Sequence, residues 1–456
     1  MRARTLLGSL AALALALAPL AAPAPAQAQG RRVVLSGVEF RTVSFDSGLG
    51  AKSVSELVVP MGIVWTFSPR LTVDLGTRFA QAQRKDEDGS SATLSGLTDV
   101  QARAVVQLVP DRVLVTVAAN LPTGKTKLTG EELAVTSAIA TDFLPYPVSS
   151  FGNGGSVTSG LALAVPVAGW AIGLAGSYRR SGEYSPLADT NLSYKPGTEL
   201  RFRVGLDRIV GQGRVSLGFT YSSFATDELG NLPQPTPRLD AFSPGNRYIS
   251  QGSWSFPVGN LGVSLYAWDL YRSAGEVPSN GSITEKQNIM TLGGAVAIQM
   301  GRNQLRPSFE YRRHTSGVDK LEAAGTLLSL GARYQMALGE RLALVPTLRF
   351  DTGSIANGGT NVSFKGFSAA MGLGRPCDQR AGGDGGSRGR LCTRAGLPRR
   401  GGAGACAPCR AEHRAGVRGD EPAGRHAERR GLVRGPREQR AVHRHHRLHR
   451  HPAGHG

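Results

Sequence analysis

Segments that alternate apolar and polar residues recur along most of this chain, and they constrain its fold more than any other feature of the sequence. In LTVDLGTRFA, residues 71–80, the odd-numbered positions are mostly apolar, whereas the even-numbered positions include Asp74 and Arg78. A period of two is the signature of a β-strand whose two faces meet different surroundings. Those surroundings are either a protein core and bulk water, as in a soluble β-sandwich, or lipid and a wet lumen, as in an outer-membrane β-barrel.

The connections between the alternating segments favour the barrel. Within a pair of segments, the connection is a turn of two or three residues rich in Gly, Pro, Asn or Asp, such as Gly259-Asn260. Between pairs, the connections are long and polar, such as residues 181–197 and 225–245. Short turns at one end and long loops at the other are typical of bacterial outer-membrane barrels, with the turns in the periplasm and the loops outside.

The strand count supports the same fold. Adding one strand near residues 33–43 and one at residues 364–374 gives about 16 strands within residues 29–374, and closure removes the strand edges that lipid does not tolerate. The sequence therefore predicts an all-β fold, a transmembrane antiparallel up-and-down β-barrel with short periplasmic turns and long extracellular loops. With about 16 strands the lumen is too wide for side chains alone to fill, so we expect a water-filled or loop-plugged passage.

Charge is divided between the two faces of the predicted strands. The residues that we assign to the outer face carry no charge, and this matters because Arg or Lys facing the bilayer midplane costs about 2–4 kcal/mol. We expect the charged residues of the opposite face to line the lumen. They are Asp74, Arg78, Asp99, Arg103, Arg201, Arg203, Asp207, Arg214, Arg306, Glu310, Arg312, Arg333, Arg349 and Asp351.

Aromatic residues of the outer face gather near both ends of the predicted strands. Such residues are enriched at the two interfaces between a membrane and water, so we expect two aromatic belts. The belt by the short turns contains Trp65, Phe67, Trp170 and Phe256, and the belt by the long loops contains Phe79, Tyr178, Tyr221 and Tyr311.

The first 28 residues have the features of a secretory signal peptide. Arg2 and Arg4 precede an apolar stretch that ends at Ala26-Gln27-Ala28, a small-x-small site that predicts cleavage before Gln29. Prolines interrupt the stretch, which argues against a membrane anchor. We therefore expect export through the inner membrane to the bacterial outer membrane.

Residues 375–456 differ sharply in composition from the rest of the chain. They contain 19 Arg against 7 acidic residues, a net charge of +12 within the formal +19 of the whole chain, and no Lys, Phe, Tyr, Trp, Ile or Met. They hold all four cysteines and eight of the nine histidines, but neither paired metal-binding clusters nor aromatics interleaved with the arginines. We interpret this segment as a low-complexity tail without metal or nucleic acid, either the product of a reading-frame slip or a real disordered extension.

Two neighbouring stretches, SGLTDVQARAVVQL and VTVAANLPTGK, resemble a family of outer-membrane proteins classed as transporters of the phenol-degradation meta-pathway (MetA-pathway) type. Members share a Gly-x-x-Asp strand opening, here Gly96 to Asp99, and a Leu-Pro-Thr-Gly strand exit, here Leu121 to Gly124. The family usually has Gly where Thr98 stands. The resemblance implies a barrel that passes small molecules, and it carries over no catalytic residues.

Residues 122–156 form the longest connection, and they include a possible short helix from Glu131 to Phe143. We interpret this connection as a surface lid rather than a constriction folded into the lumen. The arginines of the inner face could favour anionic solutes, or they could form a ladder with carboxylates that merely packs the wall. We favour the ladder, with Arg306, Glu310 and Arg312 as members.

We therefore expect an outer-membrane channel or transporter for passive passage of small molecules, hydrophobic or aromatic compounds among them, and not an enzyme. A non-conducting structural or binding barrel stays an alternative. So does a lipid hydrolase, which would rest on His314 near Ser316, although a single His beside a loop Ser is usually just surface. Expected partners are outer-membrane lipids, the solute and the outer-membrane barrel assembly machinery. We expect no cofactor, and the sequence does not decide the oligomeric state.

Overall fold

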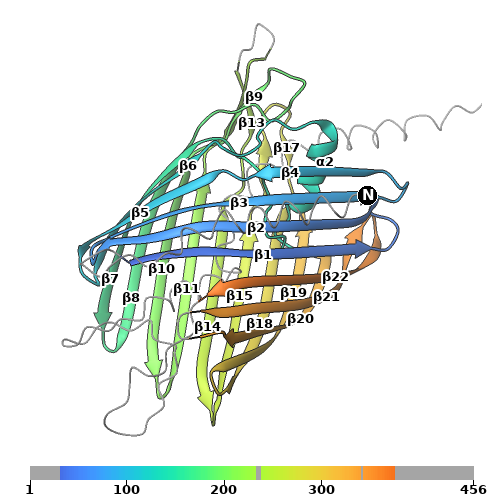
Figure 1. Cartoon of the computed structure of the whole chain (residues 1–456). Coiled ribbons are helices and arrows are strands. Elements are labelled where there is room, and N and C mark those ends of the chain that lie inside the picture. The colour runs from blue at the N-terminus through green and yellow to red at the C-terminus, as the bar shows by residue number, and fades with distance from the viewer. Residues whose placement is uncertain (1–30, 233–237, 340–341, 375–456) are drawn as a thin grey trace, which may run out of the picture.

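The computed structural model describes residues 31–232, 238–339 and 342–374, which form a closed antiparallel β-barrel (Figure 1). The barrel closes because β1 pairs with β2 on one side and with β22 on the other. The predicted signal peptide and the predicted tail lie outside the described residues. The wall strands are β1 (Arg31–Phe45), β2 (Ala51–Ser68), β3 (Leu71–Asp86), β4 (Ser91–Leu97), β5 (Val100–Val109), β6 (Val113–Leu121), β7 (Ser156–Val167), β8 (Trp170–Ser181), β10 (Glu199–Val210), β11 (Gly213–Phe224), β14 (Arg247–Val258), β15 (Leu261–Arg272), β18 (Lys286–Met300), β19 (Asn303–Gly317), β20 (Glu322–Ala337), β21 (Ala343–Asn357) and β22 (Thr360–Gly374).

The wall sheet has 17 strands, but β4 and β5 are two parts of one wall strand because both pair with β3. The described residues thus form a barrel of 16 wall strands, which confirms the predicted fold. The interruption falls at Thr98 and Asp99. The Thr98 N–H donates to the Arg78 carbonyl oxygen at 2.7 Å, and the Thr98 hydroxyl accepts from the Arg78 N–H at 3.1 Å. The Thr98 side chain therefore stabilises the wall strand at this interruption. Gly, which the resembling family usually has at this position, would not supply this hydroxyl group.

The long connections and the short turns lie at opposite ends of the barrel (Figure 1). At the short-turn end, Ala168 and Gly169 between β7 and β8 have φ values of 47° and 80°, the left-handed pair that a tight hairpin needs. At the other end, the loops form two small sheets. One consists of β9 (Ser193–Lys195), β12 (Asp227–Gly230) and β13 (Arg238–Phe242), and the other of β16 (Glu276–Val277) and β17 (Ser282–Ile283).

The outer face of the wall is broadly apolar and exposed, as lipid contact requires. Leu161, Phe202 and Leu330 are 47%, 50% and 57% exposed although a water-soluble protein would bury side chains of this size. Near the short turns, Trp65 stacks on Phe67 with ring centroids 3.9 Å apart. Near the long loops, the outward rings include those of Phe79, Tyr178 and Tyr311, each more than a third exposed, and Tyr221 packs beside Tyr248.

The prediction that the outer face carries no charge is wrong near the strand ends. Several charged residues share the outward parity of their strands. Near the strand ends, a long side chain can reach water or lipid headgroups. The free-energy cost of placing a charge at the bilayer midplane therefore does not apply there. The guanidinium of one of them lies 5.3 Å from the ring centroid of Trp170. They include Lys85, Arg180, Arg208 (the Trp170 neighbour), Asp269, Lys286, Arg313 and Lys365.

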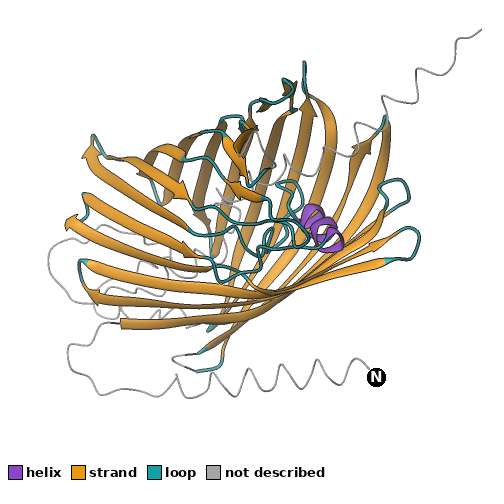
Figure 2. Cartoon of the chain, turned by 90° about the horizontal axis from the view of Figure 1, so that it is seen from above, coloured by secondary structure: helices purple, strands orange, loops and turns teal. Residues whose placement is uncertain are grey.

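Helix α2 (Gly130–Ile139) lies inside the ring of strands, together with the irregular chain that follows it (Figure 2). It begins where a helix is expected to begin, because Thr129 and Glu132 form a reciprocal capping box. Within the described part of the chain, no helix has the length and apolar content needed to cross a membrane.

Candidate functional site

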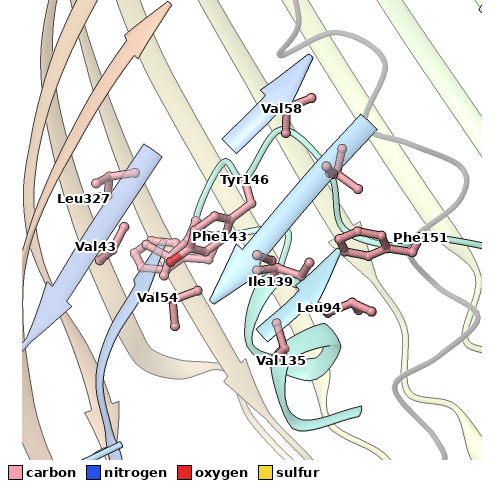
Figure 3. Close-up of a cluster of buried hydrophobic side chains, with 14 of the residues drawn as sticks. Val43, Val54, Val58, Leu94, Val135, Ile139, Phe143, Tyr146, Phe151 and Leu327 are labelled. Carbon is pink, nitrogen blue, oxygen red and sulfur yellow. The ribbon is translucent and has the colours of Figure 1, made fainter. Parts of the chain in front are cut away.

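The lumen of the barrel contains a built structure, which we call the plug segment and define as residues 122–155. Its apolar side chains pack against an apolar patch on the inner face of the wall (Figure 3). Val135, Ile139, Phe143 and Phe151 of the plug segment are at most 4% exposed. The wall contributes Val43, Val54, Val58, Ala80, Ala82, Leu94, Ile249, Trp268, Leu270, Ile289, Leu327 and Phe364 to the same cluster.

The prediction that this connection forms a surface lid is therefore wrong, and the alternative of a segment folded into the lumen is correct. The physical reason is burial of apolar area: the plug segment and the wall patch would both expose apolar side chains to water if they separated. The signal was present in the sequence, because β2 carries Val54 and Val58 on its inward parity, where a wet lumen calls for polar residues.

Charged side chains of the wall hold the irregular backbone of the plug segment. The Glu56 carboxylate accepts a hydrogen bond from the Val148 N–H at 3.1 Å, and the Arg78 guanidinium donates to the Pro147 carbonyl oxygen at 3.0 Å. Arg312 donates to the Phe143 carbonyl oxygen at 3.2 Å. Backbone groups outside regular structure need such partners when they are buried. These contacts fix the plug segment in one position.

Asp99 joins the two ends of the plug segment to the wall. One carboxylate oxygen accepts from the Gly124 N–H at 2.9 Å, and the other accepts from the Asn153 N–H at 2.8 Å. The Val100 N–H also donates to the Thr123 hydroxyl at 2.8 Å. Asp99, predicted to line the lumen, is thus a buried anchor. The two sequence motifs that contain Asp99 and Gly124 meet in space.

A network of ion pairs lies beneath the plug segment on the inner face of β19, β21 and β1. Glu310 binds Arg312 and Arg349, each at 3.0 Å, and Asp351 binds Arg349 at 2.8 Å and Arg41 at 2.7 Å. Because these groups lie in one connected network, they support one another and the wall that carries the plug segment. Four of the predicted lumen residues belong to this network. Arg306, which we expected in the ladder with Glu310 and Arg312, is not part of this network.

The remaining predicted lumen residues lie on inward positions that the plug segment leaves more open. Three of the arginines have a carboxylate partner within the wall: Arg103 pairs with Asp74 at 2.9 Å, Arg214 with Asp207 at 2.7 Å, and Arg201 with Glu199 at 2.7 Å. Among the described residues, three others have neither an ion pair nor a hydrogen bond, namely Arg203, Arg306 and Arg333.

Sequence reasoning did not single out Arg41, Glu56 or Tyr146. Arg41 and Glu56 share the inward parity of β1 and β2, so strict use of the alternation identifies both. Tyr146 lies in the plug segment under Arg41, whose guanidinium carbon is 5.6 Å from its ring centroid. Burial, the largest influence, raises the pKa of Tyr146 despite the nearby Arg41 charge, so this phenol stays neutral.

The histidine considered for hydrolysis lies against the plug segment. The His314 ring stacks on Phe143 with centroids 5.4 Å apart, so the expectation of a surface histidine is wrong. Within the described ranges, no group of three or more His, Cys, Asp or Glu residues could hold a metal ion.

Three solved structures have a fold similar to that of this chain, each at low sequence identity. OmpT of Vibrio cholerae is 10% identical, with 76% of this chain and 99% of that chain covered and a TM-score of 0.38. OprB of Pseudomonas putida is 10% identical, with 75% and 94% covered and a TM-score of 0.42. A mutant of the Rh. blastica porin is 14% identical, with 75% and 100% covered and a TM-score of 0.32. No protein-family model matches the sequence, and no curated protein matches it.

Proposed function

We propose that this chain is an outer-membrane channel through which small molecules diffuse along one side of the lumen. The proposal places the apolar outer face in lipid, the short turns in the periplasm and the long loops outside the cell. It needs no catalytic residue and no cofactor.

The observation that carries the proposal is that the plug segment packs against only part of the wall. Among the described residues, the buried cluster includes none from β6, β7, β8, β10 or β11. Inward positions on these strands carry mostly small or uncharged polar side chains, which leave space beside the plug segment. They include Ala118, Gly160, Ala162, Ala175, Ser177, Gly205 and Thr220.

The inner face also has the chemistry of a wet path. The pairs Asp74–Arg103 and Asp207–Arg214 keep between 23% and 32% of their side-chain area exposed inside the barrel. Charged groups that stay accessible in this way are stabilised by water, and an aqueous route suits polar or charged solutes. The resemblance of residues 95–125 to transporters of the phenol-degradation type is compatible with passage of small organic molecules.

Conductance in a planar lipid bilayer tests the proposal. Purified protein that resists unfolding in detergent should insert and give discrete current steps, and liposomes that contain it should swell in solutes of small size and not in larger ones. Heat-unfolded protein at the same concentration is the control. Folded protein that inserts into liposomes but gives neither current nor swelling would overturn the proposal in favour of a non-conducting barrel.

A further inference from the structure

Two arginines on the inner wall have no counter-charge, although their neighbours are paired. Among the described residues, neither Arg306 nor Arg333 takes part in an ion pair or a hydrogen bond. By contrast, Arg312 and Arg349, on the same or the adjoining strand, both bind Glu310. Something other than the described residues must therefore balance the charges of Arg306 and Arg333.

The two arginines stand directly opposite each other on adjacent strands. Arg306 of β19 is the register partner of Arg333 of β20, and the two charges interact electrostatically. Both side chains face the lumen and are half-buried. Arg306 lies three residues after the first residue of β19, Asn303, so the pair is close to the short-turn end of the barrel. Like charges in this arrangement destabilise a sheet unless an anion lies between them.

Among the described residues of β18, β19 and β20, no carboxylate is placed to fill that role. β18 contains no acidic residue, and β20 contains none after its first residue, Glu322, at the far end of the strand. On the inner face of β19, the nearest carboxylate is that of Glu310. It is four residues from Arg306, about 13 Å along a strand that rises about 3.3 Å per residue. It is also already bound by two arginines.

Next to the pair, the wall offers a further hydrogen-bond donor. Gly331, two residues before Arg333 on the same inner face, has no side chain, and a Cβ built there would lie 3.0 Å from the Ser308 hydroxyl oxygen. Ser308 is two residues after Arg306 on the inward parity of β19. Two guanidinium groups and a hydroxyl thus border one small region of the inner wall.

We propose that Arg306 and Arg333 form a binding site for an oxyanion, a phosphate or carboxylate group, at the short-turn mouth of the lumen. Guanidinium groups present parallel N–H donors that match the two oxygens of such a group, which a single halide ion cannot do. The role of this site in transport rests on the proposed channel function, but binding itself does not. In a conducting barrel, the site would favour anionic over neutral solutes.

Equilibrium dialysis of radiolabelled inorganic phosphate against the detergent-solubilised full chain tests the binding. Each of Arg306→Gln and Arg333→Gln should weaken phosphate binding about tenfold or more, since a hydrogen bond to a charged group contributes about 1.5–3 kcal/mol. Arg302→Gln is the matched control: it removes the same charge from the adjoining turn, where the side chain is exposed, and should leave binding unchanged. Unchanged phosphate binding in both site variants, or equal loss in the control, would overturn the proposal.

A second measurement separates this site from the channel proposal. Reversal potentials across a salt gradient in a planar bilayer should indicate anion preference in the parent protein, and Arg306→Gln should reduce it while Arg302→Gln should not. Phosphate should reduce chloride current at lower concentration than acetate if the site prefers phosphate, and the reverse order would assign it to carboxylates. Phosphate binding without any conductance would remove the channel function and keep the site. Conductance with the same ion preference in parent and Arg306→Gln protein would remove the site and keep the channel.

Discussion

The carboxylate of Asp99 accepts a hydrogen bond from the backbone N–H of Gly124 at 2.9 Å, and this contact ties the start of the plug segment to the wall. The second carboxylate oxygen binds the Asn153 N–H, near the end of the same segment. The Asp99 side chain therefore holds both ends of a loop of about thirty residues inside the lumen. The next two predictions test this anchoring.

Replacing Asp99 by Ala should release the plug segment without unfolding the barrel. The Gly124 and Asn153 N–H groups would lose their acceptor, and each unpaired buried N–H costs about 1–3 kcal/mol. Because wall strands do not depend on this contact, the loss should be local. Limited trypsin digestion should then cut faster at the exposed residues Lys125 and Lys127. Asp189→Ala, in an exposed loop, is the control, and an equal cleavage rate in both variants would contradict the anchoring role.

Replacing Gly124 by Ala tests the same junction by steric means. A Cβ at this position would lie 2.0 Å from the Phe151 carbonyl oxygen and 2.7 Å from the Asp99 nitrogen, so backbone must move. We expect the plug segment to exchange its amide hydrogens faster by mass spectrometry. Gly130→Ala is the matched control, since a Cβ there meets nothing within 4 Å. If the plug segment is as well protected from amide exchange in Gly124→Ala as in the control, the junction tolerates rearrangement.

The strand pattern could be predicted from the sequence because lipid leaves little choice. A residue such as Phe202 must face outward, and an error of one residue in parity would move its neighbours Arg201 and Arg203 into the bilayer. Charged residues on the outer face, such as Arg208, lie near strand ends, where the exclusion of charge from lipid is weaker. The two faces therefore follow from local alternation, and the fold class follows from it together with the short turns, the long loops and the strand count.

The plug segment and the ion pairs could not be predicted in the same way. Partners in the network are far apart in sequence, as with Arg41 and Asp351, which are 310 positions apart. Their contact depends on how β1 closes onto β22, and no local pattern encodes that register. The plug segment lacks alternation, so its place in the lumen follows only from an apolar patch of wall contributed by several strands.

Acid should loosen the start of helix α2. Burial tends to raise the pKa of Glu132, but hydrogen bonds from Lys125 and from the Thr129 N–H outweigh it and hold the pKa below its usual 4.5. A carboxyl group with a lowered pKa in the folded state contributes stability that is present above its usual pKa and is lost as pH falls below it. Amide exchange of α2 should therefore rise as pH drops below 4.5, after correction for the intrinsic rate.

The variant Glu132→Gln keeps a side-chain oxygen that can accept from the Thr129 N–H but has no titrating group, so its α2 exchange should change little with pH in acid. Because the change removes only the charge and its pairing with Lys125, the effect at neutral pH should be small, about 0.2–1 kcal/mol. A parent protein whose α2 protection does not depend on pH between 7 and 3 would contradict the assignment.

A bulky side chain on the uncovered side of the lumen should restrict the current through the channel. Ala162 of β7 faces inward, opposite Ala175 of β8, on the part of the wall that the plug segment does not cover. A Trp at this position would project into the proposed path and narrow it, so we expect single-channel conductance to fall. Leu163→Trp is the matched control, because Leu163 is the next residue and is 40% exposed on the outer face. If Ala162→Trp and Leu163→Trp conduct equally, solutes do not pass along β7, and the path must lie on the other side of the plug segment.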